Sequence, residues 1–222
     1  MPIQQMLLGV GAVATKTYVD DIFSTTLYKS TGSAVTISTG INNATDGGML
    51  WVKSRTDSAN HGIWDTERTN GYYLPVNSDD NGGDITAASG SSPFLRDGGF
   101  RWNSDHNWFN KNNSNYATFN FKKTKGFFTL KEYSGSNSAQ TLSHDLGCTP
   151  GLIIIKRTDT SGGDWMVYHR AGGATGYLKL NTTTTLATGS GIWNSTSPTS
   201  TTFSVEGNNS FVNKSGNTFI AY

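Results

Sequence analysis

The strongest constraint on this chain is an internal repeat. Residues 47–57 read GGMLWVKSRTD and residues 150–159 read PGLIIIKRTD, so Lys53 and Lys156 stand 103 positions apart. Further segments match in the same order: 63–68 with 165–170, 73–77 with 177–181, Phe100 with Phe203, and 114–119 with 217–222. Ordered matches at one period indicate a duplicated structural unit. The sequence therefore predicts two tandem units of about 100 residues, 27–123 and 124–222, after a leader of residues 1–26.

Each unit reads as β structure. Gly, Ser, Thr and Asn supply 100 of the 222 residues, a composition typical of strands and turns. Residues 48–52 and 151–155 are apolar runs of strand length, as expected of strands buried on both faces. Turn residues follow each run, which predicts a β-hairpin to a second strand near Trp64 or Trp165, with Lys53–Arg55 and Lys156–Arg157 leading out to solvent.

Flanking segments complete a sandwich pattern. Residues 34–38 and 139–143 alternate apolar with polar side chains, and so do the closing segments 116–121 and 218–222. Short strands separated by regular turn signals favour a sandwich or barrel. The predicted fold is all-β, with two tandem β-sandwich-like units joined by a linker at 122–126.

The leader differs in kind from the units. Its first part is apolar, and no Lys or Arg precedes that stretch, so it lacks the charged start of a secretory signal. Residues 15–23 predict one short helix, in which Thr17 and Asp20 resemble a capping box. We interpret the leader as an anchor whose docking residues are Met6, Leu7, Leu8, Val10, Val13, Tyr18, Ile22 and Phe23.

Charge and cysteine content exclude several classes of protein. Charged residues make up 15% of the chain and the net charge is +1, which disfavours a nucleic-acid-binding surface. No apolar run approaches the roughly 18 residues that a membrane span needs, so no membrane insertion is expected. Cys148 is the single cysteine and cannot form an intrachain disulfide.

Three motifs resemble reactive or ligand-binding sites but lack the context that such sites need. Ser143-His144-Asp145 holds triad residue types in a row, whereas a working triad converges from separate elements, so these are interpreted as turn residues. Residues 9–14 match a loose dinucleotide pattern outside a strand–turn–helix unit. Residues 77–82 resemble a calcium loop, but Ala88 stands where the closing Glu belongs. We predict no catalytic residue, cofactor or metal, with a weak calcium site at 77–82 left open.

Aromatic residues offer the best binding candidates. Trp102 and Trp108 flank Asp105 and His106, and flat rings beside polar side chains suit a glycan. The alternative, favoured for these tryptophans, is a place in the core or in a subunit interface. A polysaccharide depolymerase would need paired carboxylates, for which Asp65/Glu67 and Asp79/Asp80/Asp84 are the local clusters. We discount that reading because unit 2 has Val167 and His169 at the first of these places.

Several long segments carry a family resemblance. The leader MPIQQMLLGVGAVATKTYVDDIFSTTLY, together with GGMLWVKSRTD, SHDLGCTPGLIIIKRTD and SGNTFIAY, resembles virion proteins of marine tailed bacteriophages, cyanophage-like proteins often called tail-fibre or structural proteins. The resemblance implies a non-enzymatic virion protein, a tail-fibre or tail-associated component that docks by its N-terminus and projects its two units for host attachment. Its partners would be other virion proteins and further copies of itself, a trimer being typical of fibres. The alternatives are a capsid decoration protein, a glycan-binding receptor module and a depolymerase.

Overall fold

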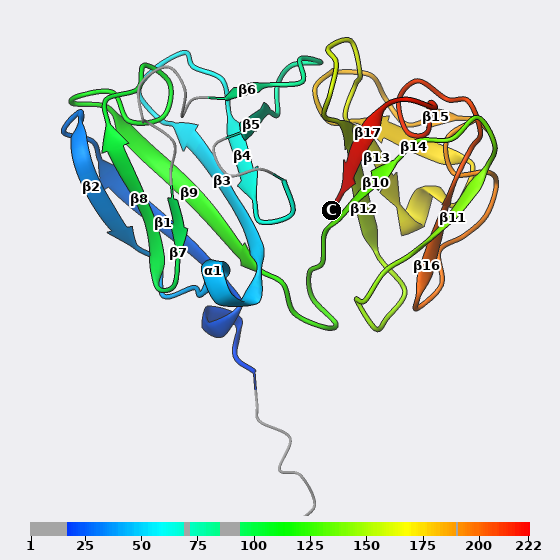
Figure 1. The fold of residues 1–222 in the computed structure, drawn as a ribbon, viewed down its shortest axis with the longest axis horizontal. Helices are drawn as coiled ribbons and strands as arrows, with labels where there is room; N and C mark the ends of the chain where they lie inside the picture. The colour runs from blue at the N-terminus through cyan, green and yellow to red at the C-terminus, as the bar shows by residue number, and fades with distance from the viewer. Residues whose placement is uncertain (1–16, 69–71, 85–93, 190) are drawn as a thin grey trace, which may run out of the picture.

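The chain folds into two lobes of antiparallel strands that lie side by side (Figure 1). This computed structural model describes residues 17–68, 72–84, 94–189 and 191–222. The helical segments among them are short: the 3-10 turns η1 (Val19–Asp21) and η2 (Arg170–Gly172), and α1 (Asn43–Asp46). The predicted all-β, sandwich-like fold is confirmed.

Unit 1 is a sandwich of a six-stranded and a three-stranded sheet. Its strands are β1 (Phe23–Lys29), β2 (Ser33–Ser38), β3 (Gly48–Ser54), β4 (Gly62–Asp65), β5 (Tyr72–Pro75), β6 (Gly83–Asp84), β7 (Phe94–Arg96), β8 (Gly99–Ser104) and β9 (Asn115–Lys122). The large sheet has the order β1-β9-β3-β4-β5-β6, and the small sheet has the order β2-β8-β7. The core between them buries Leu50, Trp64, Phe100 and Trp102.

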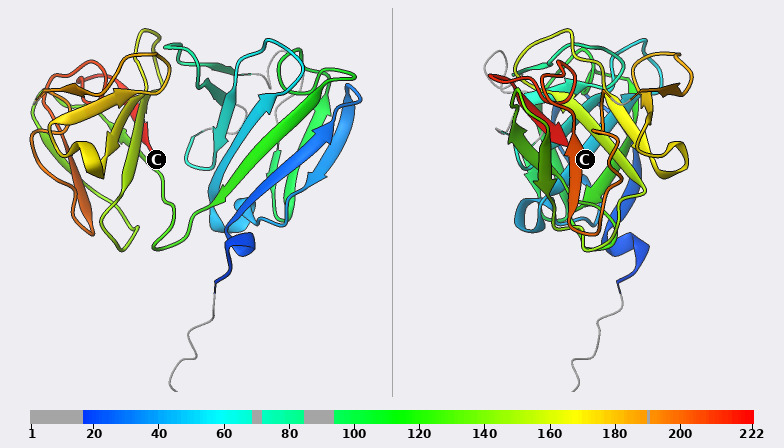
Figure 2. Two further views of the ribbon diagram at one scale, coloured as in Figure 1. Left: turned by 180° about the vertical axis from the view of Figure 1, so that it is seen from behind. Right: turned by 90° about the vertical axis from the view of Figure 1, so that its right-hand side faces the viewer.

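Unit 2 repeats this arrangement (Figure 2). Its strands are β10 (Lys131–Ser134), β11 (Gln140–Ser143), β12 (Leu152–Arg157), β13 (Met166–His169), β14 (Gly176–Lys179), β15 (Ala187–Thr188), β16 (Thr202–Val205) and β17 (Thr218–Ala221). The large sheet has the order β10-β17-β12-β13-β14-β15, and β11 pairs with β16. Strand for strand, the large sheet matches that of unit 1. The exact unit boundaries stay a prediction.

The strand register shows which residues are equivalent in the two units. Thr118 pairs with Val52 and Ala221 pairs with Ile155, which gives the expected offset of 103. One part of the sequence alignment was wrong. Asp65 pairs with Met49 and His169 with Leu152, so the second hairpin strand is offset by 104 rather than 102. The turn in unit 2 contains one residue more than its counterpart, where the sequence reading assumed one fewer.

The run in β3 is covered on both faces of its sheet, as predicted, whereas in β12 Leu152 stays half exposed. In β3, Leu50 and Val52 enter the core of unit 1, whereas Met49 and Trp51 point to the opposite face of the sheet and contact the other unit. Adjacent strand residues alternate between the two faces, so a continuous apolar run needs cover on both. The second cover is the neighbouring unit.

Two local predictions were wrong. Instead of a helix over 15–23, the described residues form the turn η1 and then β1 from Phe23, because the Ile22 carbonyl accepts a hydrogen bond from Lys122 N–H and the next residues join β9. The residue at the N-cap of η1 is Tyr18 rather than Thr17. Lys156 and Arg157 do not lead out to solvent. They are 0% and 8% exposed within β12, and backbone carbonyls receive their hydrogen bonds.

Candidate functional site

The two large sheets pack outer face to outer face, and we call this contact the seam. It is an apolar cluster with contributions from both units. Its buried members are Met49, Ile63, Leu74 and Val76 from unit 1 with Trp165 and Ile220 from unit 2. Around them pack Trp51, Phe121, Phe128, Ile154 and Tyr222. Burial of so much apolar surface holds the two units against each other.

Polar groups at the edge of the seam add directional ties. Trp165 Nε1 donates to the carbonyl of Pro75 at 2.9 Å, and the ammonium of Lys156 donates to the carbonyl of Asp79 at 2.7 Å. Gly162 N–H donates to the same carbonyl at 3.1 Å. Burial lowers the pKa of Lys156 to about 8, although the nearby carboxylates of Asp79 and Asp164 favour its charged form. These bonds fix how the units are rotated relative to each other.

A second polar tie involves the last residue of the chain. The carboxylate of Asp65 accepts a hydrogen bond from Arg68 Nε at 2.7 Å and one from the Tyr222 hydroxyl at 2.6 Å. The Asp65 side chain has no exposed surface and that of Arg68 is 6% exposed. Burial raises the pKa of Tyr222 well above its usual value, so its hydroxyl keeps the proton that it donates. Asp65 thus joins the two units through a buried, hydrogen-bonded charge.

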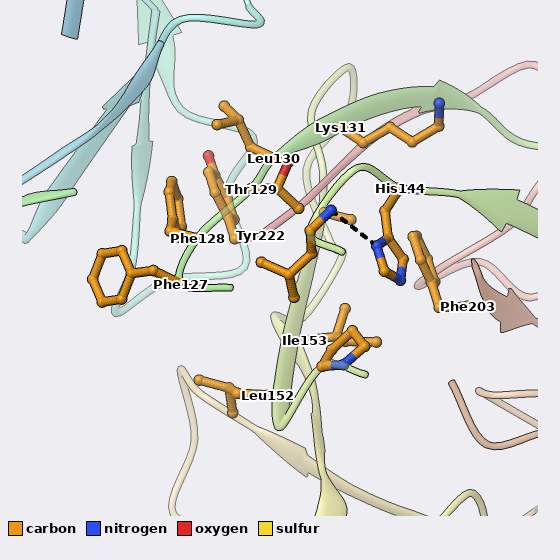
Figure 3. A pocket seen from close by; sticks show the side chains of 13 residues that line it. Phe127, Phe128, Thr129, Leu130, Lys131, His144, Leu152, Ile153, Phe203 and Tyr222 are labelled. Carbon is orange, nitrogen blue, oxygen red and sulfur yellow. Dashed lines mark hydrogen bonds between the residues drawn. The ribbon is translucent and has the colours of Figure 1, made fainter. Parts of the chain in front are cut away.

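A cavity of about 290 Å³ lies within the seam. Its walls are apolar and come from both units: Met49, Trp51, Ile63, Phe121, Phe127, Phe128, Leu146, Pro150, Leu152, Ile154, Trp165, Leu180 and Tyr222, with Gly151. A side pocket of about 70 Å³ shares Phe127, Phe128, Leu152 and Tyr222 with this cavity (Figure 3). Such a space can receive an apolar group but offers little to a charged one.

His144 lines the side pocket with its imidazole ring. Its Nδ1 accepts the N–H of Leu146 at 3.3 Å, the dashed bond in Figure 3, and its ring stacks on Phe203. Its Nε2 is buried and has no hydrogen-bond partner among the described residues. Asp145 pairs instead with Lys123 at 3.0 Å, so Ser143, His144 and Asp145 form no chain of hydrogen bonds. The prediction that all three are turn residues was wrong for Ser143, which is the last residue of β11 and pairs with Thr202.

The predicted glycan residues do not all lie together. Trp102 has no exposed surface, and its Nε1 donates to the Tyr28 hydroxyl at 2.9 Å within the core. A glycan contact by Trp102 is therefore wrong, because its ring lies in the core between the two sheets. Asp105, His106 and Trp108 do share the loop between β8 and β9.

That loop presents one large ring to solvent. Trp108 is 38% exposed and packs edge-on against Tyr73, while His106 stacks on Phe109 at 5.1 Å. Burial lowers the pKa of His106, although Asp105 acts in the opposite direction. At neutral pH the imidazole is therefore neutral, and it can exchange hydrogen bonds with a polar ligand. Among the predicted glycan residues, these three stay candidates.

The described members of the predicted docking set, Tyr18, Ile22 and Phe23, lie at the opposite end of unit 1. β9 runs from Asn115, beside the Trp108 loop, to Lys122, whose N–H bonds to Ile22. Tyr18 is 61% exposed at this end. Phe23 is part of β1 and packs on Phe121, so it does not project as an anchor. Met6, Leu7, Leu8, Val10 and Val13 lie outside the described residues, as does the 9–14 motif.

The candidate calcium loop is used for contacts between and within the units. Asn77 accepts the N–H of His61, and Asn81 accepts the hydroxyl of Ser161 in unit 2. Among the described residues, no three His, Cys, Asp or Glu side chains gather as a metal site. The predicted carboxylate pair also separates: Asp65 is buried in the seam, whereas Glu67 is exposed.

One protein-family model matches most of the chain. A model described as a domain of unknown function, DUF7483, matches residues 19–222. The chain belongs to this family. The DUF7483 match spans both units and the seam between them. Neither curated proteins nor solved structures yield a match. Within the part of the chain that the structure describes, no helix is long and apolar enough to cross a bilayer.

Sequence reasoning missed the seam as a site. The signal was present, because Met49 and Trp51 alternate with core residues along β3 and require cover from a second layer. The ties through Lys156 and Asp65 had no such signal. The Lys156 tie depends on the backbone carbonyl of Asp79, and the Asp65 tie depends on the hydroxyl of Tyr222. Only folding brings these groups close.

Proposed function

We propose that this chain is a structural component of a bacteriophage virion, a tail-associated protein that docks by its leader and presents its two units for host attachment. The observation that carries the proposal is the polarity of the molecule. The chain enters at one end of unit 1, beside α1, and the Trp108 loop lies at the other end (Figure 1).

The second unit extends the same polarity. β3 and β12 both run away from the end at which the chain enters, so the hairpin turns that follow them lie at the opposite end of the molecule (Figure 1). The seam joins the units through apolar contacts and buried hydrogen bonds, which suits a module that transmits force. The resemblance of the leader and the repeat segments to virion proteins supports the phage assignment.

A receptor contact is proposed at the Trp108 loop as part of this function. Trp108 is exposed, and Asp105 and His106 lie beside it on the same loop. A flat ring with polar neighbours matches the faces of a sugar. At the offset of 103, Phe211 takes the place of Trp108 in unit 2, but it packs against the core of that unit with the Lys179 ammonium over its ring, so we assign this contact to unit 1.

Removal of residues 1–16 should separate folding from assembly. The shortened chain retains every described strand, so we expect it to fold with the secondary structure of the full chain, measured by far-ultraviolet circular dichroism. We expect its copy number on purified particles to fall at least tenfold, measured by quantitative mass spectrometry after complementation of a phage deletion. A matched chain with the leader residues in scrambled order controls for length. Normal incorporation of either variant would contradict docking by the leader.

A further inference from the structure

The mouth of the seam cavity carries three exposed apolar side chains. Phe127 is 40% exposed, Leu152 50% and Leu180 38%, and all three line the cavity. Exposed apolar groups that surround a hollow are typical of a surface that another segment covers. No described residue covers these three side chains fully, because each of them keeps more than a third of its surface exposed.

The leader joins the fold close to this mouth. Phe23, the first residue of β1, lies 4.8 Å from Phe121 and 6.5 Å from Phe127, measured between ring centroids. Phe121 and Phe127 both line the cavity. The sixteen residues before Thr17 can extend roughly 50 Å, which greatly exceeds one layer of rings. The leader therefore has the length to reach the cavity of its own molecule.

The chemistry of the two surfaces is complementary. Residues 6–14 read MLLGVGAVA and contain no charge, while most of the surface of the cavity walls is apolar. Transfer of Leu7, Leu8 and Val10 from water into the cavity would gain hydrophobic free energy without desolvating a charged group.

We propose that residues 6–13 occupy the seam cavity of their own molecule before the chain joins a particle. Attachment to the same chain gives the leader an effective concentration in the millimolar range, which favours this arrangement over capture by a second copy. The docked leader shields its own apolar side chains and covers Phe127 and Leu152 at once. This inference goes beyond the proposed function and does not depend on the presence of virions.

The single native cysteine permits a direct test on the free chain. Cys148 is exposed, and it lies between Leu146 and Pro150, which line the cavity. In a Leu8→Cys variant, a short bis-maleimide should link residue 8 to Cys148 within one molecule. The product is a monomer with altered electrophoretic mobility, and peptide mapping identifies the link.

Two matched substitutions control this experiment. Leu152→Asp places a charge at the cavity mouth and should reduce the intramolecular link at least tenfold, whereas Leu27→Asp alters a still more exposed leucine on β1 and should leave the link unchanged. Both leucines are at least half exposed, so both variants should fold. A link found mainly between two chains, or a yield insensitive to Leu152→Asp, would overturn the proposal. Loss of particle docking alone would leave it standing.

Discussion

Replacement of Trp102 by alanine should destabilise the protein by about 3–5 kcal/mol, the usual cost of removing a large aromatic ring from a core. The ring has no exposed surface and lies edge-on to Trp64, with centroids 5.5 Å apart. Its Nε1 also donates to the Tyr28 hydroxyl, which would lose a buried partner. Urea unfolding, followed by tryptophan fluorescence and by circular dichroism, measures the change.

Trp108→Ala provides the matched control. This ring is 38% exposed at a loop, so its removal should cost at most about 1 kcal/mol. On a glycan array, Trp108→Ala should abolish binding if the loop holds the receptor contact, while the protein stays folded. If Trp102→Ala were as stable as Trp108→Ala, the assignment of Trp102 to the core would be wrong.

Replacement of Asp65 by alanine should be comparably damaging, with a loss of about 3–5 kcal/mol. The substitution leaves the guanidinium of Arg68 and the hydroxyl of Tyr222 buried without the carboxylate that binds both. Because Tyr222 belongs to unit 2, we also expect the two units to unfold in separate transitions in the variant. Differential scanning calorimetry resolves one transition from two.

Asp46→Ala is the control for a simple loss of charge. Its carboxylate pairs with Lys122 at 2.8 Å, but both side chains are partly exposed, at 37% and 25%. Such surface pairs contribute at most about 1 kcal/mol, and both partners of this one belong to unit 1. Equal losses for the two aspartates would show that the buried bonds of Asp65 do not join the units.

The sequence was a good guide to the strands because a buried strand leaves a periodic pattern. The runs 48–52 and 151–155 and the alternating segments 34–38 and 139–143 all lie in strands at nearly the expected places. The period of the repeat also anticipated the shared strand order of the two large sheets. The helix predicted over 15–23 failed, because pairing of β1 with β9 outweighs the local propensity of a short segment.

The candidate site was less accessible to sequence reasoning. Trp102 and Trp108 are six positions apart and chemically identical, yet one is in the core and the other in solvent. Only the packing of the small sheet against the large sheet, which encloses Trp102 and leaves Trp108 outside, distinguishes them. Lys156 was expected in solvent because lysine is seldom buried, and its carbonyl partner, Asp79, is 77 positions away in the other unit. Contacts of such long range leave no local pattern.

Imaging of intact particles tests the central claim most directly. An averaged cryo-electron microscopy map, with the chain tagged in the loop that holds Trp108, locates both ends of the molecule on the virion. We predict density for two adjoining lobes, with the Thr17 end against the particle and the tagged loop outermost. A map with the loop end buried against the particle, or particles that lack the chain altogether, would contradict an attachment module anchored by its leader.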